Sequence, residues 1–415
     1  MKHIAKNIYE YAKTLIKWVF FAALLGVIGG IVGSLFHITI EEVTHLRGEN
    51  PWIILLLPLG GIVIAGMYHL FKKKGKIDTN RVLESISGDE KVPFVMAPLI
   101  FISAGITHLL GGSAGREGAA LQLGGSIGYK LGKLFKFNKN DLHIMVMSGM
   151  SAVFAALFGT PVAAAIFAIE VVCVGIFRHT AFLACIISAV FGYKTAVWFQ
   201  IAPVRFSLSP LLESTPDFVI KSAIIAVLSA FVSILFCYMI KKAEYVAYKI
   251  AKNSYLRGFL GGLAIIVLTF LVGTYDYNGA GMNIIENAIS GTAKPEAFIL
   301  KIIFTAITIA AGFKGGEIVP AFFVGSTFGC LMGHVLGIDA GFAAAIGFVS
   351  LFCGVTNCPI ASLVLAVEVF GSEWIAIFAL GCSLSYILSG YTGLYKSQKI
   401  MFSKTNDENI NINVK

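Results

Sequence analysis

The stretch GGSAGREGAALQLGGSIG, residues 111–128, places one arginine and one glutamate among glycines and small or apolar residues. A glycine-rich turn leading into a helix offers free backbone N–H groups at the positive end of the helix dipole, which bind anions without a full positive charge. A carboxylate at Glu117 is stabilised by the same N–H groups, so it competes with an anion for one place. The stretch therefore predicts an anion site gated by protonation of Glu117; the simpler alternative is a helix-start glutamate paired with Arg116 for structural reasons.

The composition places this stretch inside a membrane. Of the 415 residues, 57% are hydrophobic and 13% are charged, whereas soluble domains are about 45–50% apolar and about 25% charged. The apolar runs supply roughly ten or more membrane helices, since about 20 apolar residues span the hydrocarbon core. Several runs are short and interrupted by glycine, which favours broken and re-entrant helices that line a pathway. The sequence predicts an all-α integral membrane protein in contact with the lipid bilayer.

The net charge of +9 is interpreted as a topology signal, and no nucleic-acid partner is predicted. Lysine-rich connections face the cytoplasm by the positive-inside rule. They lie at residues 2–17, 72–76, 130–139, 241–252 and 396–404. Both termini are therefore expected in the cytoplasm, and the protein is expected to be a multi-pass protein of a cell membrane, the bacterial plasma membrane.

The cysteines give no sign of a metal or a cofactor. All seven fall within apolar segments, their number is odd, and no CxxC pair exists. This pattern predicts neither a disulfide framework nor a metal site, and no cofactor is expected.

Two pairs of similar motifs show that the chain contains an internal repeat. GREGAALQLGGSIG at 115–128 aligns with GGEIVPAFFVGSTFG at 315–329, so that Glu117 falls on Glu317. FGTPVAAAIFAIEVV at 158–172 aligns with TNCPIASLVLAVEVF at 356–370, with a proline nine residues before a glutamate in both. A repeat at a fixed offset indicates a duplicated fold, and duplicated membrane folds place their binding site between the halves.

These motifs divide the chain into five segments. We expect a cytoplasmic N-terminal segment (1–14), a first membrane repeat (15–200), a linker (201–216), a second membrane repeat (217–395) and a C-terminal cytoplasmic tail (396–415). The tail is polar and short, and we expect it to be disordered.

The same motifs resemble those of the CLC anion channels and transporters. GREGAALQLGGSIG resembles the family's GREGP motif and GGEIVPAFF resembles its GxFxP motif, and the resemblance covers nearly the whole membrane region. It implies a CLC-type fold of two inverted-topology repeats and a homodimer in which each subunit has its own pore. It implies transport of a halide, chloride or fluoride, most simply in exchange for protons.

The resemblance also assigns roles to residues. Glu117 resembles the external gating glutamate, and Tyr395 resembles the inner-gate tyrosine, with Tyr391 as a nearby rival. The backbone N–H groups of four residues are implied to lie close to the anion: Arg116, Glu117, Ile318 and Val319. The family's first filter motif, GSGIP, is absent from residues 78–86, where either Thr79 or Asn80 takes the place of its serine; both residues are also plausible helix N-caps.

Several departures resemble the fluoride/proton branch of the family. The proline after GREG is Ala119, and the phenylalanine of GxFxP is Ile318. Glu170 matches the first of two adjacent glutamates of the family's exchangers, but the second, the internal proton carrier, is Val171. Asn80 at the filter would fit the fluoride branch, whereas Thr79 would resemble a chloride filter. Glu170 and Glu368 have a structural alternative, in which they satisfy helix ends between the halves.

Three other functions compete with halide exchange. A passive, uncoupled chloride channel would result if nothing replaces Val171 as a proton carrier. An intramembrane enzyme is suggested by GGSAG around Ser113, but the serine-nucleophile turn belongs to a strand-to-helix turn in a sheet, and none is expected here. A cation transporter would need acidic residues that converge within one half. The sequence therefore predicts a transporter and not an enzyme.

Overall fold

The computed structural model describes residues 2–71, 77–88, 90–208 and 215–415. The lysine-rich connection at 72–76 and part of the 201–216 linker lie outside them. The first eight α-helices are α1 (Lys2–Glu49), α2 (Leu57–Leu70), α3 (Thr79–Ser87), α4 (Met96–Leu109), α5 (Glu117–Leu134), α6 (Lys139–Phe158), α7 (Pro161–Glu170) and α8 (His179–Trp198), with a 3-10 helix η1 (Pro51–Leu56). The next eight are α9 (Pro216–Ile250), α10 (Ser254–Val272), α11 (Met282–Ile289), α12 (Ala297–Ala311), α13 (Ile318–Leu336), α14 (Ala340–Thr356), α15 (Pro359–Phe370) and α16 (Ile375–Leu388). The strands are β1 (Cys173–Val174), β2 (Lys399–Phe402) and β3 (Asn409–Asn413).

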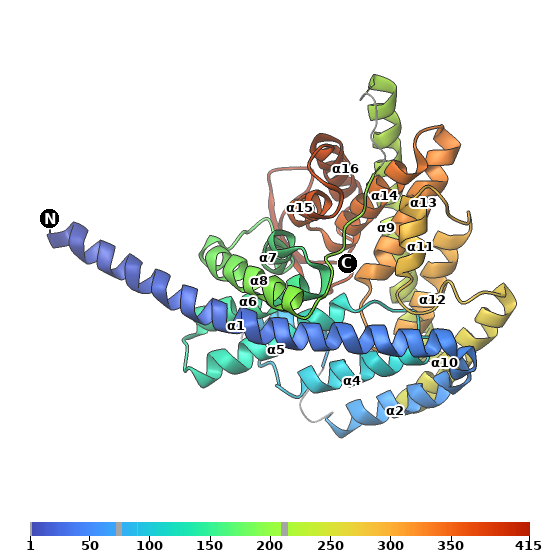
Figure 1. Cartoon of the computed structure of the whole chain (residues 1–415), viewed down its shortest axis with the longest axis horizontal. Coiled ribbons are helices and arrows are strands. Elements are labelled where there is room, and N and C mark those ends of the chain that lie inside the picture. Colours follow the sequence, from blue (N-terminus) through green and yellow to red (C-terminus); the bar gives the residue numbers. More distant parts are fainter. Residues whose placement is uncertain (1, 72–76, 89, 209–214) are drawn as a thin grey trace.

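The two halves of the chain pack in the same way. Helix α5 packs on α6 as α13 packs on α14, and α1 packs on α6 and α8 as α9 packs on α14 and α16. Figure 1 shows the blue-to-green half and the yellow-to-red half side by side, with α1 running along one side of the bundle and projecting beyond it. The predicted all-α fold of two repeats is thus confirmed.

The helices differ in whether they are long enough to cross a membrane. Within the described residues, seven helical segments are long and apolar enough to do so, including Ile8–Glu49, Pro216–Ile250 and Ile318–Leu336. Others are apolar but short, such as α7 and α15. Short helices that stop inside the bundle leave their termini in the interior, where a binding site can use the free backbone groups.

Glycine permits close contact between the backbones of two helices in each half. Gly124 of α5 and Gly149 of α6 touch through their backbones, because a Cβ on either would collide with the carbonyl group of the other. Gly325 of α13 and Gly347 of α14 repeat this contact in the second half. Small residues let membrane helices approach closely enough for backbone packing. The aligned GGSIG and VGSTFG strings therefore encode a packing contact.

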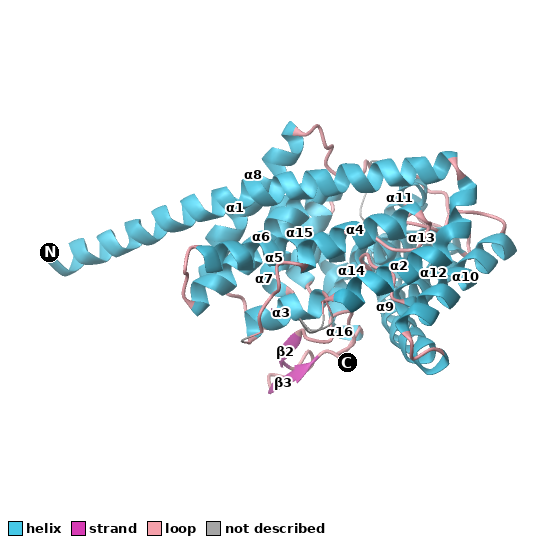
Figure 2. Cartoon of the chain, turned by 90° about the horizontal axis from the view of Figure 1, so that it is seen from below, coloured by secondary structure: helices cyan, strands magenta, loops and turns pink. Residues whose placement is uncertain are grey.

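The prediction of a disordered tail is wrong. Strand β2 pairs in parallel with β1, from the first half, and antiparallel with β3, and Figure 2 shows β2 and β3 at one edge of the molecule. Ile400 and Val414 are buried together with Val174 of β1. Alternating apolar residues give a strand one buried face, and this short alternation in NINV was hidden by the polar composition of the tail.

Candidate functional site

The two glycine-rich turns meet at the centre of the molecule. The backbone N–H of Gly115 donates to the carbonyl oxygen of Gly316 at 2.7 Å, and that of Gly316 donates to Gly115 at 2.6 Å, in an isolated antiparallel bridge. The bridge sets the first turns of α5 and α13 against each other. Each first turn has N–H groups without an intrahelical partner. The two halves therefore direct the positive ends of two helices at one buried place.

The carboxylate of Glu117 occupies this place. The side chain is completely buried, and the backbone N–H of Arg116 donates to its Oε2 at 2.9 Å. The backbone N–H of Val319, from the other half, also interacts with the carboxylate. Oε1 has no hydrogen-bond partner and lies 3.7 Å from Nε of Arg116. The carboxylate is thus held largely by backbone N–H groups, which could equally hold an anion.

The structure brings four of the predicted site residues together. Arg116 and Glu117 begin α5, and Ile318 and Val319, both buried, begin α13 against them. Burial in a dry interior strengthens the attraction between an anion and N–H dipoles. An anion can bind here only where the Glu117 carboxylate is displaced or neutralised, because the two carry the same charge.

A cavity of about 490 Å³ lies between the turn that precedes α13 and the strands of the tail, since Glu317, Lys399 and Asn413 all line it. It is lined by α3, the C-terminal part of α9, the turn before α13 and the segment after α16. Four carboxylates and four lysines line it. Charged side chains are costly to bury without water or a partner, so a lining of this kind is typical of a hydrated cavity.

The geometry separates Thr79 from Asn80. Both line the cavity, but the hydroxyl of Thr79 faces α5, where it accepts from Nε2 of Gln122 at 3.1 Å and lies 3.5 Å from the carbonyl oxygen of Gly118. The side-chain oxygen of Asn80 instead accepts from Ser397, in the segment after α16. Neither residue is the N-cap of α3, because the side chain of Asp78 accepts from the backbone N–H of Arg81.

The two candidate tyrosines differ in the same way. Tyr395 lines the cavity, is 3% exposed, and has a buried hydroxyl without a hydrogen-bond partner. It lies within electrostatic reach of Glu117 and Glu317. The hydroxyl of Tyr391 is 3.0 Å from that of Ser403 in the tail. Only Tyr395 of the two combines a position on the cavity with an unused O–H donor.

Glu317 lines the cavity, a position that was not predicted from the sequence. It aligns with Glu117 in the repeat, yet it precedes α13 as its N-cap residue and lines the cavity. The repeat itself was the available signal, because a second glutamate at the equivalent turn is unexpected in an apolar segment. The centre therefore has one buried carboxylate from the first half and one cavity-lining carboxylate from the second.

Glu170, at the end of α7, caps the N-terminus of α15, and Glu368, in α15, caps the N-terminus of α7. The carboxylate of Glu170 accepts from the backbone N–H groups of Ile360 and Ala361 at 3.2 and 2.8 Å. That of Glu368 accepts from Val162 and Ala163 at 3.1 and 2.8 Å. These bonds satisfy the N-termini of α15 and α7 and confirm the structural interpretation of both glutamates. The constant proline-to-glutamate spacing thus reflects a reciprocal cap between the halves.

Removal of either capping carboxylate is expected to destabilise the fold without changing the number of protons moved per anion. Glu170→Ala and Glu368→Ala each leave two N–H groups unpaired, so we expect the free energy of unfolding to fall by about 1–3 kcal/mol. Thermal unfolding in detergent measures this loss, and Asp217→Ala, which removes an exposed first-turn carboxylate of α9, is the control. A change in the protons moved per anion by Glu170→Gln would contradict the structural assignment and make Glu170 a proton carrier.

Ser113 is engaged in packing between the halves. Its hydroxyl is 3.0 Å from that of Thr305, and its backbone N–H donates to the hydroxyl of Thr308 at 3.0 Å. These contacts tie the turn before α5 to α12, and neither hydroxyl group is basic enough to activate a serine nucleophile. Within the described residues, no cluster of three potential metal ligands is present either.

The fold and the site define a membrane protein of two inverted repeats whose helix N-termini converge on a buried carboxylate. Comparison with known proteins agrees. The sequence model of the family described as "Voltage gated chloride channel" matches residues 60–390. A "Chloride/fluoride channel protein" of Pseudomonas syringae pv. tomato is 32% identical over 395 residues, which are 94% of this chain and 87% of the relative.

Solved structures share the fold. A CLC-type fluoride/proton antiporter matches with a TM-score of 0.89 and 29% identity, over 93% of this chain and 98% of that one. A slow cyanobacterial Cl⁻/H⁺ antiporter matches with a TM-score of 0.77 and 19% identity, over 90% and 94% of the two chains, which speaks for the fold alone. The chain belongs to the CLC family, and the predicted resemblance is confirmed. CLC proteins are transport proteins rather than enzymes.

Proposed function

We propose that this protein exchanges fluoride for protons across a membrane, with Glu117 as the gate. The observation that carries the proposal is the completely buried carboxylate of Glu117, held by backbone N–H groups from both halves. Ionised, it fills the anion position; protonated, it loses its hold on the N–H groups and leaves them to an anion. Glu117 thus takes up one proton each time it vacates the anion position, and this couples proton movement to anion movement.

Fluoride is favoured over chloride by the relatives and by the lining of the site. The relative at 32% identity is named for chloride and fluoride, and the structure at 29% identity is named as a fluoride/proton antiporter. In the proposed path, the anion meets the N–H groups of Arg116, Glu117, Ile318 and Val319, then the hydroxyl groups of Thr79 and Tyr395. A small, strongly hydrated anion needs several hydrogen-bond donors to replace its water.

Liposomes that contain the purified protein test the function. They are loaded with potassium fluoride or potassium chloride, and anion efflux and external pH are recorded together, with and without a proton ionophore. We expect fluoride efflux with proportional proton uptake, so that the external pH rises, and slower chloride efflux. Rapid chloride efflux with no change in pH would establish the alternative, a passive channel, which the absence of a carboxylate at Val171 favours.

A homodimer and a plasma-membrane location are part of the same proposal. Support for the dimer comes from the CLC resemblance and from short apolar helices whose outer residues are exposed, such as Val162 on α7 and Ile360 on α15. A second copy would cover such a surface. Support for cytoplasmic termini comes from the lysine-rich connections, which the positive-inside rule assigns to the cytoplasm.

A further inference from the structure

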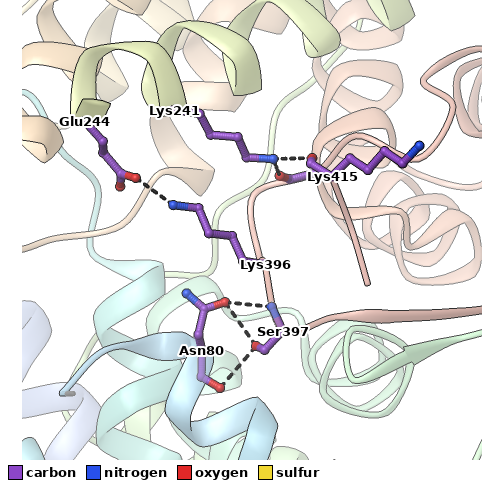
Figure 3. Close-up of polar contacts among 7 residues, drawn as sticks. Asn80, Lys241, Glu244, Lys396, Ser397 and Lys415 are labelled. Atoms are coloured by element: carbon purple, nitrogen blue, oxygen red, sulfur yellow. Dashed lines mark hydrogen bonds and ion pairs between the residues drawn. The ribbon is translucent and has the colours of Figure 1, made fainter. Parts of the chain in front are cut away.

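The segment Gly393–Ser397, here called the strap, runs along the wall of the cavity and carries Tyr395. Every residue of the strap lines the cavity. Figure 3 shows the strap between two anchors, one on α3 in the first half and one on α9 in the second. The anchors matter because the Tyr395 hydroxyl has no hydrogen-bond partner, so no polar contact at the tip of the side chain fixes its position.

The anchor to α3 is the side chain of Asn80. The backbone N–H of Ser397 donates to Oδ1 of Asn80 at 3.1 Å. The hydroxyl of Ser397 lies 3.0 Å from the same Oδ1 and 3.1 Å from the backbone oxygen of Asn80. All three contacts are partly buried, and they join positions 317 residues apart in the chain.

The anchor to the second half consists of two lysine contacts. Nζ of Lys241 donates to the carbonyl oxygen of Gly393 at 2.9 Å, and Lys396 forms an ion pair with Glu244 at 2.8 Å. The side chains of Lys396 and Glu244 are 58% and 40% exposed, and exposed ion pairs contribute little because solvent and salt screen them. The N-terminal side of the strap is held further by the backbone N–H of Leu394, which donates to Val355 of α14 at 2.9 Å.

Asn80 is therefore the tie between Ser397 and α3. Beyond Ser397 the chain is held separately, because Gln398 donates to the end of α14 and β2 pairs with β1. Loss of the Asn80 contacts thus loosens the strap between Tyr395 and Gln398. The looser strap lets the ring of Tyr395 move at the inner end of the anion path, and water and anions then reach the centre independently of Glu117.

We propose that Asn80 is a positioning residue that holds Tyr395 in place through Ser397, and that its side-chain oxygen, not its N–H₂ group, carries this role. The proposal rests on the proposed function in taking Tyr395 as the inner end of the path. It replaces the expectation that Asn80 itself binds the anion, and it leaves Thr79, which faces Gly118 and Gln122, as the polar residue at the filter.

Asn80→Ala removes the two contacts with Oδ1 of Asn80, and Ser397→Ala removes the two contacts of the Ser397 hydroxyl, so the contact between these two side chains is lost in both. Each is measured in two ways: by amide hydrogen exchange of the strap in detergent, and by the fluoride and protons moved in liposomes. We expect strap amides to exchange about tenfold faster in both variants, as loss of roughly one hydrogen bond implies, and the protons moved per fluoride to fall at least about twofold. The double variant removes all three contacts, and its effect should be smaller than the sum of the two single effects, because one contact is lost in both single variants.

Two further variants sharpen the test. Asn80→Asp keeps an oxygen acceptor for Ser397 but has no N–H₂ donor, so strap exchange should stay near that of the original protein. Ser403→Ala is the matched control, because Ser403 is a serine of the same tail whose hydroxyl contacts Tyr391 and not the strap; both readouts should be unchanged.

The outcomes separate this proposal from the proposed function. Unchanged strap exchange in Ser397→Ala, or altered coupling in Asn80→Ala alone, would overturn the positioning role and return Asn80 to the list of anion ligands. Fluoride efflux without proton movement in the unaltered protein would overturn the proposed exchange. The hydrogen-exchange comparison does not depend on transport, so it decides the strap contacts in either case.

Discussion

Glutamine at position 117 is expected to reduce the protons moved per anion at least about 100-fold, the scale on which a proton-transferring side chain acts. Glutamine has nearly the size of glutamate and still fits the completely buried position, but it cannot take up or release a proton. The N–H groups of Arg116 and Val319 then face a side chain whose charge never changes. Fluoride and pH recorded together in liposomes measure the loss.

Glu296→Gln is the matched control for this change. Glu296 is also a glutamate at the start of a helix, since it is the N-cap residue of α12, but it is exposed. Coupling should be unchanged in this variant, which separates the effect of a buried carboxylate from that of any helix-start glutamate. Continued proton pumping against a gradient by Glu117→Gln would show that the gate lies elsewhere.

Leucine at position 149 is expected to prevent correct packing of α6 on α5. A Cβ on Gly149 collides with the carbonyl group of Gly124 and approaches the backbone N of Gly128, and backbone atoms cannot move aside as a flexible side chain can. The helices must separate, and we expect a loss of about 3 kcal/mol or more in the free energy of unfolding. Thermal unfolding and the monodisperse fraction on size-exclusion chromatography in detergent measure it.

A glycine of the same kind without the contact provides the comparison. Gly105 is buried in the middle of α4, but an added Cβ there meets no atom within 4 Å. Gly105→Ala should be neutral or should stabilise the helix by about 0.5–1 kcal/mol, the difference in helix propensity. An equal free energy of unfolding for Gly149→Leu and Gly105→Ala would mean that the α5–α6 contact does not limit stability.

Motifs that recur within the sequence were sufficient to predict the two-repeat fold and the position of Glu117 at the start of a helix. The aligned GREG and GGEI turns identified two halves, and the prediction that Glu117 begins a helix at a glycine-rich turn is confirmed. The proline-to-glutamate spacing was also informative, because a cap requires a carboxylate at a fixed position of the partner repeat. Such features are visible in sequence because each depends on a short string whose local geometry is fixed.

Structural features that depend on contacts between distant segments could not be predicted from the sequence. The tail forms strands only because β1, more than 200 residues earlier, supplies an edge, and composition alone suggested disorder. The choice between Thr79 and Asn80 was open for the same reason: the two are adjacent, and the direction of each side chain is set by what packs against it.

The sequence by itself determined an integral membrane protein of two repeats, the glycine-rich turns that precede two helices, and a titratable glutamate at a helix start. Hydrophobicity, backbone freedom and the helix dipole are properties of local strings, so they can be inferred without coordinates. The tertiary structure alone decided that Gly115 pairs with Gly316, that Glu317 lines the cavity, and that Ser397 reaches Asn80. These are contacts between residues about 200 to 300 positions apart, and they exist only because the folded halves bring unrelated segments within hydrogen-bond distance.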